Sequence, residues 1–170
     1  VNISAVQLRQ RDIVDQIFDV LRETGLESKH LEVELTESAI IEDFDSSSSK
    51  LKMLRKKGIS IALDDFGTGY SSLSYLKNLP VDTLKIDRTF VRNILSDSAD
   101  VAIIKAVVTL AHSLGLNVVA EGVETIEQED LIRQTRCDEI QGYLFSKPLP
   151  TQEATALLQA DQSAGTRLAV

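Results

Sequence analysis

Residues 60–73 read SIALDDFGTGYSSL, and the fold prediction starts from this stretch. Its first part, Ser60–Asp64, is short and mostly apolar, as buried strands of parallel sheets are. Asp64 and Asp65 follow at the end of that strand, and Gly67 and Gly69 supply turn conformations. Taken alone, the two aspartates and two glycines could be no more than a turn, so the interpretation depends on the neighbouring segments.

Short β-prone runs of the same kind occur on both sides of this strand. Five further strands are predicted, at Val1–Ser4, Leu31–Leu35, Thr83–Asp87, Asn117–Glu121 and Glu139–Leu144. Helical patterns lie between them: one along Ile13–Leu21 with Gly25 as its cap, one that ends before Gly58, one at about Ala99–Leu114, one that opens near Thr125, and one at Thr151–Gln159. The serine run Ser46–Ser49 is predicted to be a solvated helix start or loop.

Six β-then-α units in a row predict an α/β fold with a parallel sheet and helical crossovers. Closure into a TIM-like (β/α) barrel needs eight strands, and such barrels typically have about 250 residues. The chain has 170 residues and is about two units short of that. An open doubly wound sheet therefore stays possible from the pattern alone.

Composition narrows the class of protein. The chain is 43% hydrophobic, as a folded domain is, and no apolar run approaches the ~18–20 residues of a membrane span. Its net charge of −8 argues against duplex nucleic acid as a partner, although bound metal ions could still reverse the local field for a small phosphate ligand. A single cysteine, Cys137, fits a reducing cytoplasm.

Polar residues fall at the ends of the predicted strands: Asn2, Glu34, Asp64, Asp65, Lys85, Asp87, Glu121 and Gln141. One glutamate at a strand end is usually a cap or a surface charge, but recurrence on successive strands favours a shared site. The carboxyl ends of barrel strands converge on one face, where active sites lie. Crowded carboxylates need a counter-charge. Oxygen ligands favour Mg²⁺ or Mn²⁺, and paired ions are a recurring device for phosphodiester hydrolysis.

At these residues the chain resembles the EAL family of cyclic di-GMP phosphodiesterases. The matching stretches are VNIS (1–4), ELTE (34–37), DDFGTGYSSL (64–73), LKID (84–87), AEGVE (120–124) and QGYLFSKP (141–148). The resemblance implies hydrolysis of cyclic di-GMP to linear pGpG. It implies metal ligation by Asn2, Glu34, Asp64 and Asp65, and catalytic roles for Glu121, Lys85 and Gln141.

The resemblance also implies roles beyond the inner site. Phe145 and Pro148 would contact the substrate, and the protein would be a homodimer. A loop held by Glu37 would couple metal binding to the dimer interface; its residues are Phe66, Gly67, Thr68, Gly69, Tyr70, Ser71 and Ser72.

One family feature is missing: no Glu-Ala-Leu motif precedes Asn2. Residues 1–160 are therefore interpreted as a partial EAL domain with about six of eight strands, and residues 161–170 as a disordered tail. This chain is expected to have little activity by itself, whereas its parent domain is expected to be active. Two alternatives stay open: a receptor that binds cyclic di-GMP without cleaving it, and a metal-dependent lyase or an aldolase that forms an imine at Lys85. His30 and His112 are interpreted as structural or surface residues, and Cys137 as a packing residue.

Overall fold

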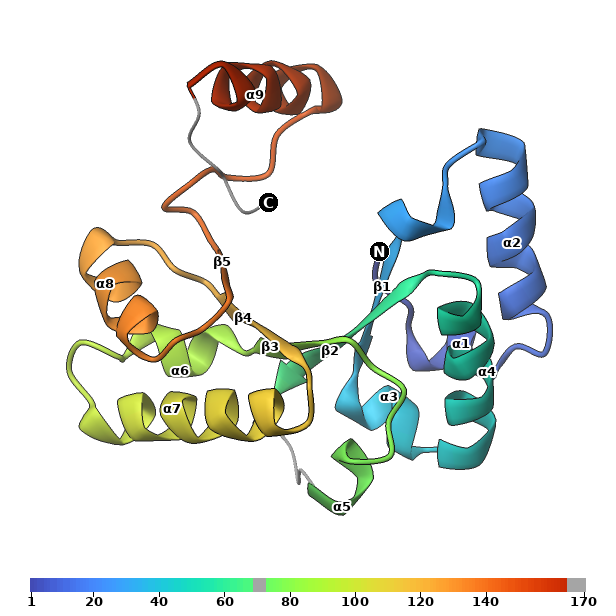
Figure 1. Ribbon diagram of the computed structural model, residues 1–170, viewed down its shortest axis with the longest axis horizontal. Helices are drawn as coiled ribbons and strands as arrows, with labels where there is room; N and C mark the ends of the chain where they lie inside the picture. Colours follow the sequence, from blue (N-terminus) through green and yellow to red (C-terminus); the bar gives the residue numbers. More distant parts are fainter. Residues whose placement is uncertain (69–72, 165–170) are drawn as a thin grey trace.

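A computed structural model describes residues 1–68 and 73–164. Its centre is a five-stranded sheet in the order β1-β2-β3-β4-β5, in which every strand runs parallel to the next (Figure 1). The strands are β1 Glu32–Thr36, β2 Ser60–Phe66, β3 Thr83–Ile86, β4 Asn117–Glu121 and β5 Glu139–Gln141. Successive strands are neighbours and are joined by helical crossovers, so the chain forms part of a (β/α) barrel.

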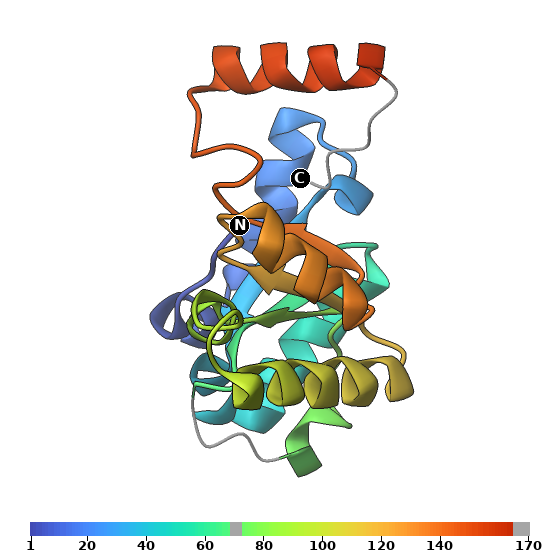
Figure 2. The same ribbon diagram turned by 90° about the vertical axis from the view of Figure 1, so that its left-hand side faces the viewer.

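Within the described residues, five of the helices were predicted and four short ones were not. They are α1 Ala5–Arg9, α2 Ile13–Thr24, α3 Glu37–Ile41, α4 Phe44–Lys56, α5 Leu73–Leu76, α6 Arg88–Arg92, α7 Ser98–Ser113, α8 Ile126–Gln134 and α9 Thr151–Ala164, with a 3₁₀ turn η1 at Ser28–His30. Gly25 ends α2 with φ of +71°, as expected of a C-terminal cap. Thr125 caps α8 through a capping box with Gln128. Helix α9 lies apart from the other helices in both views and continues beyond Gln159, to Ala164 (Figures 1 and 2).

The strand predicted at Val1–Ser4 is wrong except at one residue. Asn2 forms an isolated parallel bridge with Glu34, and the chain then turns into α1. The reason is local: the Ser4 hydroxyl accepts a hydrogen bond from Gln7 N, and the Gln7 side chain accepts one from Ser4 N. This capping box starts α1 at Ala5 and so ends the pairing after the single bridge at Asn2. The described sheet therefore has five strands rather than six.

Two other strands end earlier than predicted. Strand β3 stops at Ile86 because Asp87 caps α6, its side chain accepting a hydrogen bond from Thr89 N. Strand β5 stops at Gln141, after which the chain turns at Gly142. In both cases the strand pairing ends at the carboxyl end of the strand, and the chain forms a hydrogen-bonded turn there.

The core lies between the sheet and the helices that contact it. Helices α3 and α4 pack on β2, and α7 packs on β3 and β4. Fully buried side chains come from both layers, including Ile61, Leu63, Leu84, Leu51 and Ile104.

The prediction for Ser46–Ser49 is wrong in part. The run lies in a helix, but Ser47 and Ser48 are only 4% and 6% exposed. They share the inner side of α4 with Leu51, and their small size suits the contacts of α4 with α3 and α1. Burial here is set by neighbours that are distant in sequence, and the local composition does not reveal it.

Within residues 1–68 and 73–164, none of the helices combines the length and the apolar character that a membrane crossing requires.

Candidate active site

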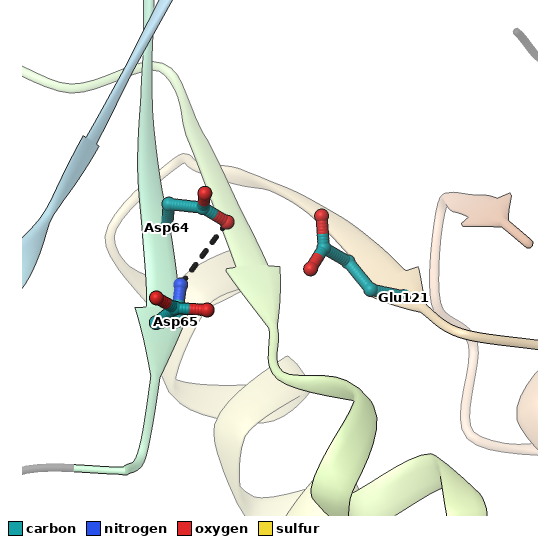
Figure 3. A group of neighbouring side chains, drawn as sticks. All are labelled: Asp64, Asp65 and Glu121. Atoms are coloured by element: carbon teal, nitrogen blue, oxygen red, sulfur yellow. Dashed lines mark hydrogen bonds between the residues drawn. The ribbon is translucent and has the colours of Figure 1, made fainter. Parts of the chain in front are cut away.

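Carboxylates from two strands meet at the carboxyl edge of the sheet. Asp64 and Asp65 lie at the end of β2, and Glu121 lies at the end of β4 (Figure 3). Each offers an oxygen atom, and these three atoms all lie within 4.8 Å of one another. The side chains face one another across β3, which lies between their strands. The geometry is that of a cation site built from hard oxygen donors.

Asp65 reaches this cluster through an irregular backbone. Successive residues of a regular strand point to opposite faces of the sheet, so Asp64 and Asp65 should diverge. Asp65 instead has φ of +54°, and the β2–β3 register breaks between Leu63 and Phe66. The Asp65 N–H also donates to Asp64 Oδ1 at 3.1 Å, which is the dashed line in Figure 3. A left-handed conformation at a non-glycine residue is uncommon, and such strain is concentrated at functional sites.

Lys85 of β3 provides the positive charge of the site. Its ammonium nitrogen lies 2.8 Å from Glu34 Oε2, 3.2 Å from Asp64 Oδ1 and 2.7 Å from Glu121 Oε1. The Lys85 side chain is 5% exposed. Burial lowers its pKa, but the hydrogen bonds to Glu121 and Glu34 outweigh burial and raise the pKa above its ordinary value. Lys85 is therefore a permanent cation whose three N–H groups all face carboxylates.

At Glu121, unlike at Lys85, the effect of burial on the pKa outweighs that of the hydrogen-bonded partner. Burial raises the pKa of its carboxyl group, the hydrogen bond and charge of Lys85 lower it, and the charges of Asp64 and Glu34 raise it again. The net pKa lies above the ordinary value for glutamate. A carboxylate with a raised pKa is a better proton acceptor near neutral pH than a solvated one.

Asp87 belongs to the same region, although the sequence prediction gave it no role. It is 8% exposed, and its Oδ1 accepts hydrogen bonds from Thr89 N at 2.9 Å and Thr89 Oγ1 at 2.5 Å. Burial raises the pKa of Asp87, but these hydrogen bonds hold it below its ordinary value. Burial and the negative charges of Asp64 and Asp87 raise the pKa of Asp65. The sequence signal that could have identified Asp87 as a site residue is its position directly after β3.

Asn2 and Gln141 lie on either side of these groups. Backbone hydrogen bonds of 2.9 Å join Ile3 N to Glu34 O and Glu34 N to Val1 O, which places Asn2 beside Glu34. Gln141 is the register partner of Glu121 in the β4–β5 pair. Gln141 also lines a cavity of about 500 Å³ together with Glu34, Lys85, Phe145 and Pro148. Residues predicted to act on the phosphate and residues predicted to contact the bases thus border one space.

The loop after β2 is described only at its start. Phe66 is buried, and Thr68 Oγ1 donates to Asp65 O at 2.9 Å. Glu37 is the first residue of α3. The other predicted loop residues, Gly69, Tyr70, Ser71 and Ser72, lie outside the described residues.

Comparison with known proteins adds an independent finding. The sequence model of the EAL domain matches residues 1–148. The chain is 44% identical over 160 residues to cyclic di-GMP phosphodiesterase NbdA of Pseudomonas aeruginosa; this covers 94% of the chain and 20% of that protein. The chain thus spans about a fifth of the length of the curated relatives it matches.

Solved structures of relatives share this fold. The chain superimposes on the MucR phosphodiesterase of Pseudomonas aeruginosa in complex with c-di-GMP with a TM-score of 0.87 and 44% identity, covering 91% of this chain and 62% of that one. A manganese and c-di-GMP complex of BlrP1 from Klebsiella pneumoniae gives a TM-score of 0.80 and 38% identity, covering 87% of this chain and 38% of that one.

Proposed function

Because the chain belongs to the EAL domain family, we propose that its domain hydrolyses cyclic di-GMP to linear pGpG with divalent cations bound at the carboxyl edge of the sheet. The observation that carries this proposal is the cluster of Asp64, Asp65 and Glu121, whose oxygens lie within 4.8 Å of one another. The charged Lys85 is paired with Asp64 and Glu121 of this cluster. NbdA and MucR are named as phosphodiesterases of this substrate, and each shares 44% of its residues with the chain over the matched region.

The residues present fit a magnesium or manganese site. Asn2, Glu34, Asp64 and Asp65 would hold the ions, since carboxylate and amide oxygens are the ligands that these ions prefer. The BlrP1 complexes were solved with calcium and with manganese, which supports a divalent requirement. Bound divalent ions would lower the pKa of a coordinated water and stabilise negative charge on the phosphate.

The chain's own groups would complete the reaction. Glu121, with its raised pKa, would accept the proton of the attacking water. Lys85 would donate a hydrogen bond to the phosphate in the transition state, once cations share the carboxylates that it now contacts. Gln141 would support the same inner shell, and Phe145 would contact a guanine from the cavity wall, with Pro148 on the same rim.

The lyase or aldolase alternative is not supported by the electrostatics of Lys85. An amine that forms an imine needs a lowered pKa so that the neutral form is accessible. The three carboxylates around Lys85 raise its pKa instead. We therefore do not propose imine chemistry at this residue.

The proposal extends to assembly and coupling. We also propose that the protein is a cytoplasmic homodimer. The loop Phe66–Ser72, held by Glu37, would couple metal binding to the dimer interface. The hydrogen bond from Thr68 Oγ1 to Asp65 O supports the coupling role, because it ties the start of the loop to a predicted metal ligand.

The test is to follow cyclic di-GMP and pGpG by chromatography, with Mn²⁺ and with EDTA, using a protein that carries this domain. The proposal expects metal-dependent conversion that Asp64→Asn reduces at least about a hundredfold. Asp19→Asn, at an exposed carboxylate paired with Arg22, is the matched control and should leave the rate unchanged. Binding of cyclic di-GMP without any pGpG would favour the receptor alternative and contradict the proposal.

A further inference from the structure

The turn that follows β5 is attached to the segment that follows β4. Three backbone hydrogen bonds hold it: Val123 N to Gln141 O at 3.1 Å, Leu144 N to Val123 O at 3.0 Å and Phe145 N to Gly142 O at 3.2 Å. Two of them reach Val123, which is completely buried. The turn Gln141–Phe145 therefore has a fixed position relative to the end of β4.

Gly142 is the point of closest contact in this attachment. A methyl group built on its α-carbon would lie 2.0 Å from Val123 O and 2.4 Å from Val123 N. Both atoms are backbone, and both take part in the hydrogen bonds that hold the turn. A flexible side chain could move aside, but these atoms cannot move without breaking those bonds. Any residue other than glycine must therefore displace the turn.

We infer that Gly142 is a positioning residue: its missing side chain lets the turn Gln141–Phe145 dock on Val123, and this docking sets where Gln141 and Phe145 stand in the cavity. The inference rests on the proposed function, which assigns Gln141 to catalysis and Phe145 to the substrate. It adds that this wall of the cavity is positioned separately from the groups on β2 and β3. Gly142 lies in the turn and contacts Val123, shortly after Glu121 at the end of β4. Asp64, Asp65 and Lys85 are instead held by β2 and β3.

This separation predicts a selective defect. In Gly142→Ala the turn moves away from Val123, so Phe145 leaves its place, while β2 and β3 are untouched. The KM for cyclic di-GMP is expected to rise at least tenfold. The Mn²⁺ concentration that gives half-maximal activity is expected to stay within twofold of the wild-type value.

The matched control is Gly115→Ala. Gly115 precedes β4 at the opposite edge of the sheet, and a methyl group there would meet nothing within 4 Å. Its φ of +75° makes alanine unfavourable, so this variant reports general destabilisation without displacing the turn. Its KM is expected to match that of the wild type. In a Phe145→Ala background, Gly142→Ala is expected to add less than threefold to KM, because its effect on KM acts through the position of Phe145.

Hydrogen exchange in the wild-type protein tests the docking without an activity assay and without a variant that folds. The amides of Val123 and Leu144 should be protected in the wild-type protein, and both should lose protection together in Gly142→Ala if that variant folds. Unprotected wild-type amides, or a Gly142→Ala protein with wild-type KM, would overturn the inference. A wild-type protein that leaves cyclic di-GMP intact while both amides are protected would instead contradict the proposed function.

Discussion

The ammonium group of Lys85 balances three carboxylates that are each only 15–21% exposed: Glu34, Asp64 and Glu121. Replacing it with methionine leaves these charges close together without a counter-ion. In EDTA, Lys85→Met is expected to reduce the free energy of unfolding by about 3 kcal/mol. Mn²⁺ should restore more stability to this variant than it adds to the wild type, because the ion takes over the missing charge.

Urea unfolding with and without Mn²⁺ measures this difference. Arg22→Met is the control, because Arg22 pairs with Asp19 on the surface and such pairs contribute at most about 1 kcal/mol. Equal stability of Lys85→Met and the wild type in EDTA would mean that the carboxylates do not need Lys85.

Asp65 illustrates a conflict between stability and function. Its pKa is raised in the folded chain, so its contribution to stability is present at low pH and is lost as the pH rises through the folded pKa. At neutral pH its charge therefore opposes folding. Asparagine tolerates φ of +54° and carries no charge. Asp65→Asn is expected to be as stable as the wild type or slightly more stable at pH 7, yet at least tenfold less active. Thermal unfolding at pH 7 and the hydrolysis assay check both halves, and a clear loss of stability would contradict the electrostatic account.

Cys137 should react slowly. Burial raises the pKa of its thiol to about 11, and its sulfur lies 3.2 Å from Val118 O and 3.3 Å from Glu139 O. At pH 8 the thiolate fraction is then about two orders of magnitude below that of a free cysteine. Alkylation by iodoacetamide at pH 8 should be correspondingly slower in the folded chain than in guanidinium chloride. Similar rates in both conditions would show that the thiol is exposed.

Two connections at the amino edge of the sheet are each held by an aspartate that binds a backbone N–H of the preceding strand. Asp82, before β3, accepts a hydrogen bond from Ile61 N at 3.0 Å and is paired with Arg55. Asp138, before β5, accepts one from Val118 N at 2.8 Å and is paired with His112. Asp82→Ala leaves the Ile61 N–H and the Arg55 side chain without this acceptor. It is expected to cost about 1–3 kcal/mol in urea unfolding, whereas Asp19→Ala should cost less than about 1 kcal/mol.

Periodicity predicted the elements that depend on local pattern. The strand Asn117–Glu121 has the predicted bounds, Gly25 acts as the predicted cap, and α8 begins next to Thr125, where a helix was predicted to open. The pattern failed where another interaction outweighed it. The Ser4–Gln7 capping box started a helix at Ala5 and left the predicted first strand as a single bridge, and contacts with other helices buried Ser47 and Ser48.

The site shows the same division between local and distant causes. Strand ends indicated which carboxylates could meet, because parallel strands deliver them to one edge. A regular two-residue period does not reveal the left-handed conformation of Asp65. It does not reveal the effect of Asp87 on the pKa of Asp65 either. Both depend on the break in register between β2 and β3.

The molecule as a whole has an open sheet. Within residues 1–68 and 73–164, β5 pairs with β4 alone, and β1 pairs with β2 and with Asn2 at a single bridge. The cavity beside these edges is lined by apolar groups such as Val119, Ile140 and Leu157. Unpaired strand edges next to apolar surface favour association with another chain. Residues 1–170 expressed alone are therefore expected to form dimers or larger species and to bind a hydrophobic dye.

Light scattering coupled to size-exclusion chromatography measures this directly. If the apolar surface beside the open edges drives association, Leu158→Lys, which places a charge at an exposed residue of the cavity wall, should shift the population toward monomer. A control substitution at an exposed apolar residue on the helical side, Met53→Lys in α4, should not. A wild-type chain that is monomeric at all concentrations and unfolds cooperatively would mean that the five strands form a stable sheet without further partners. The edges would then be sufficiently protected by their own twist and side chains.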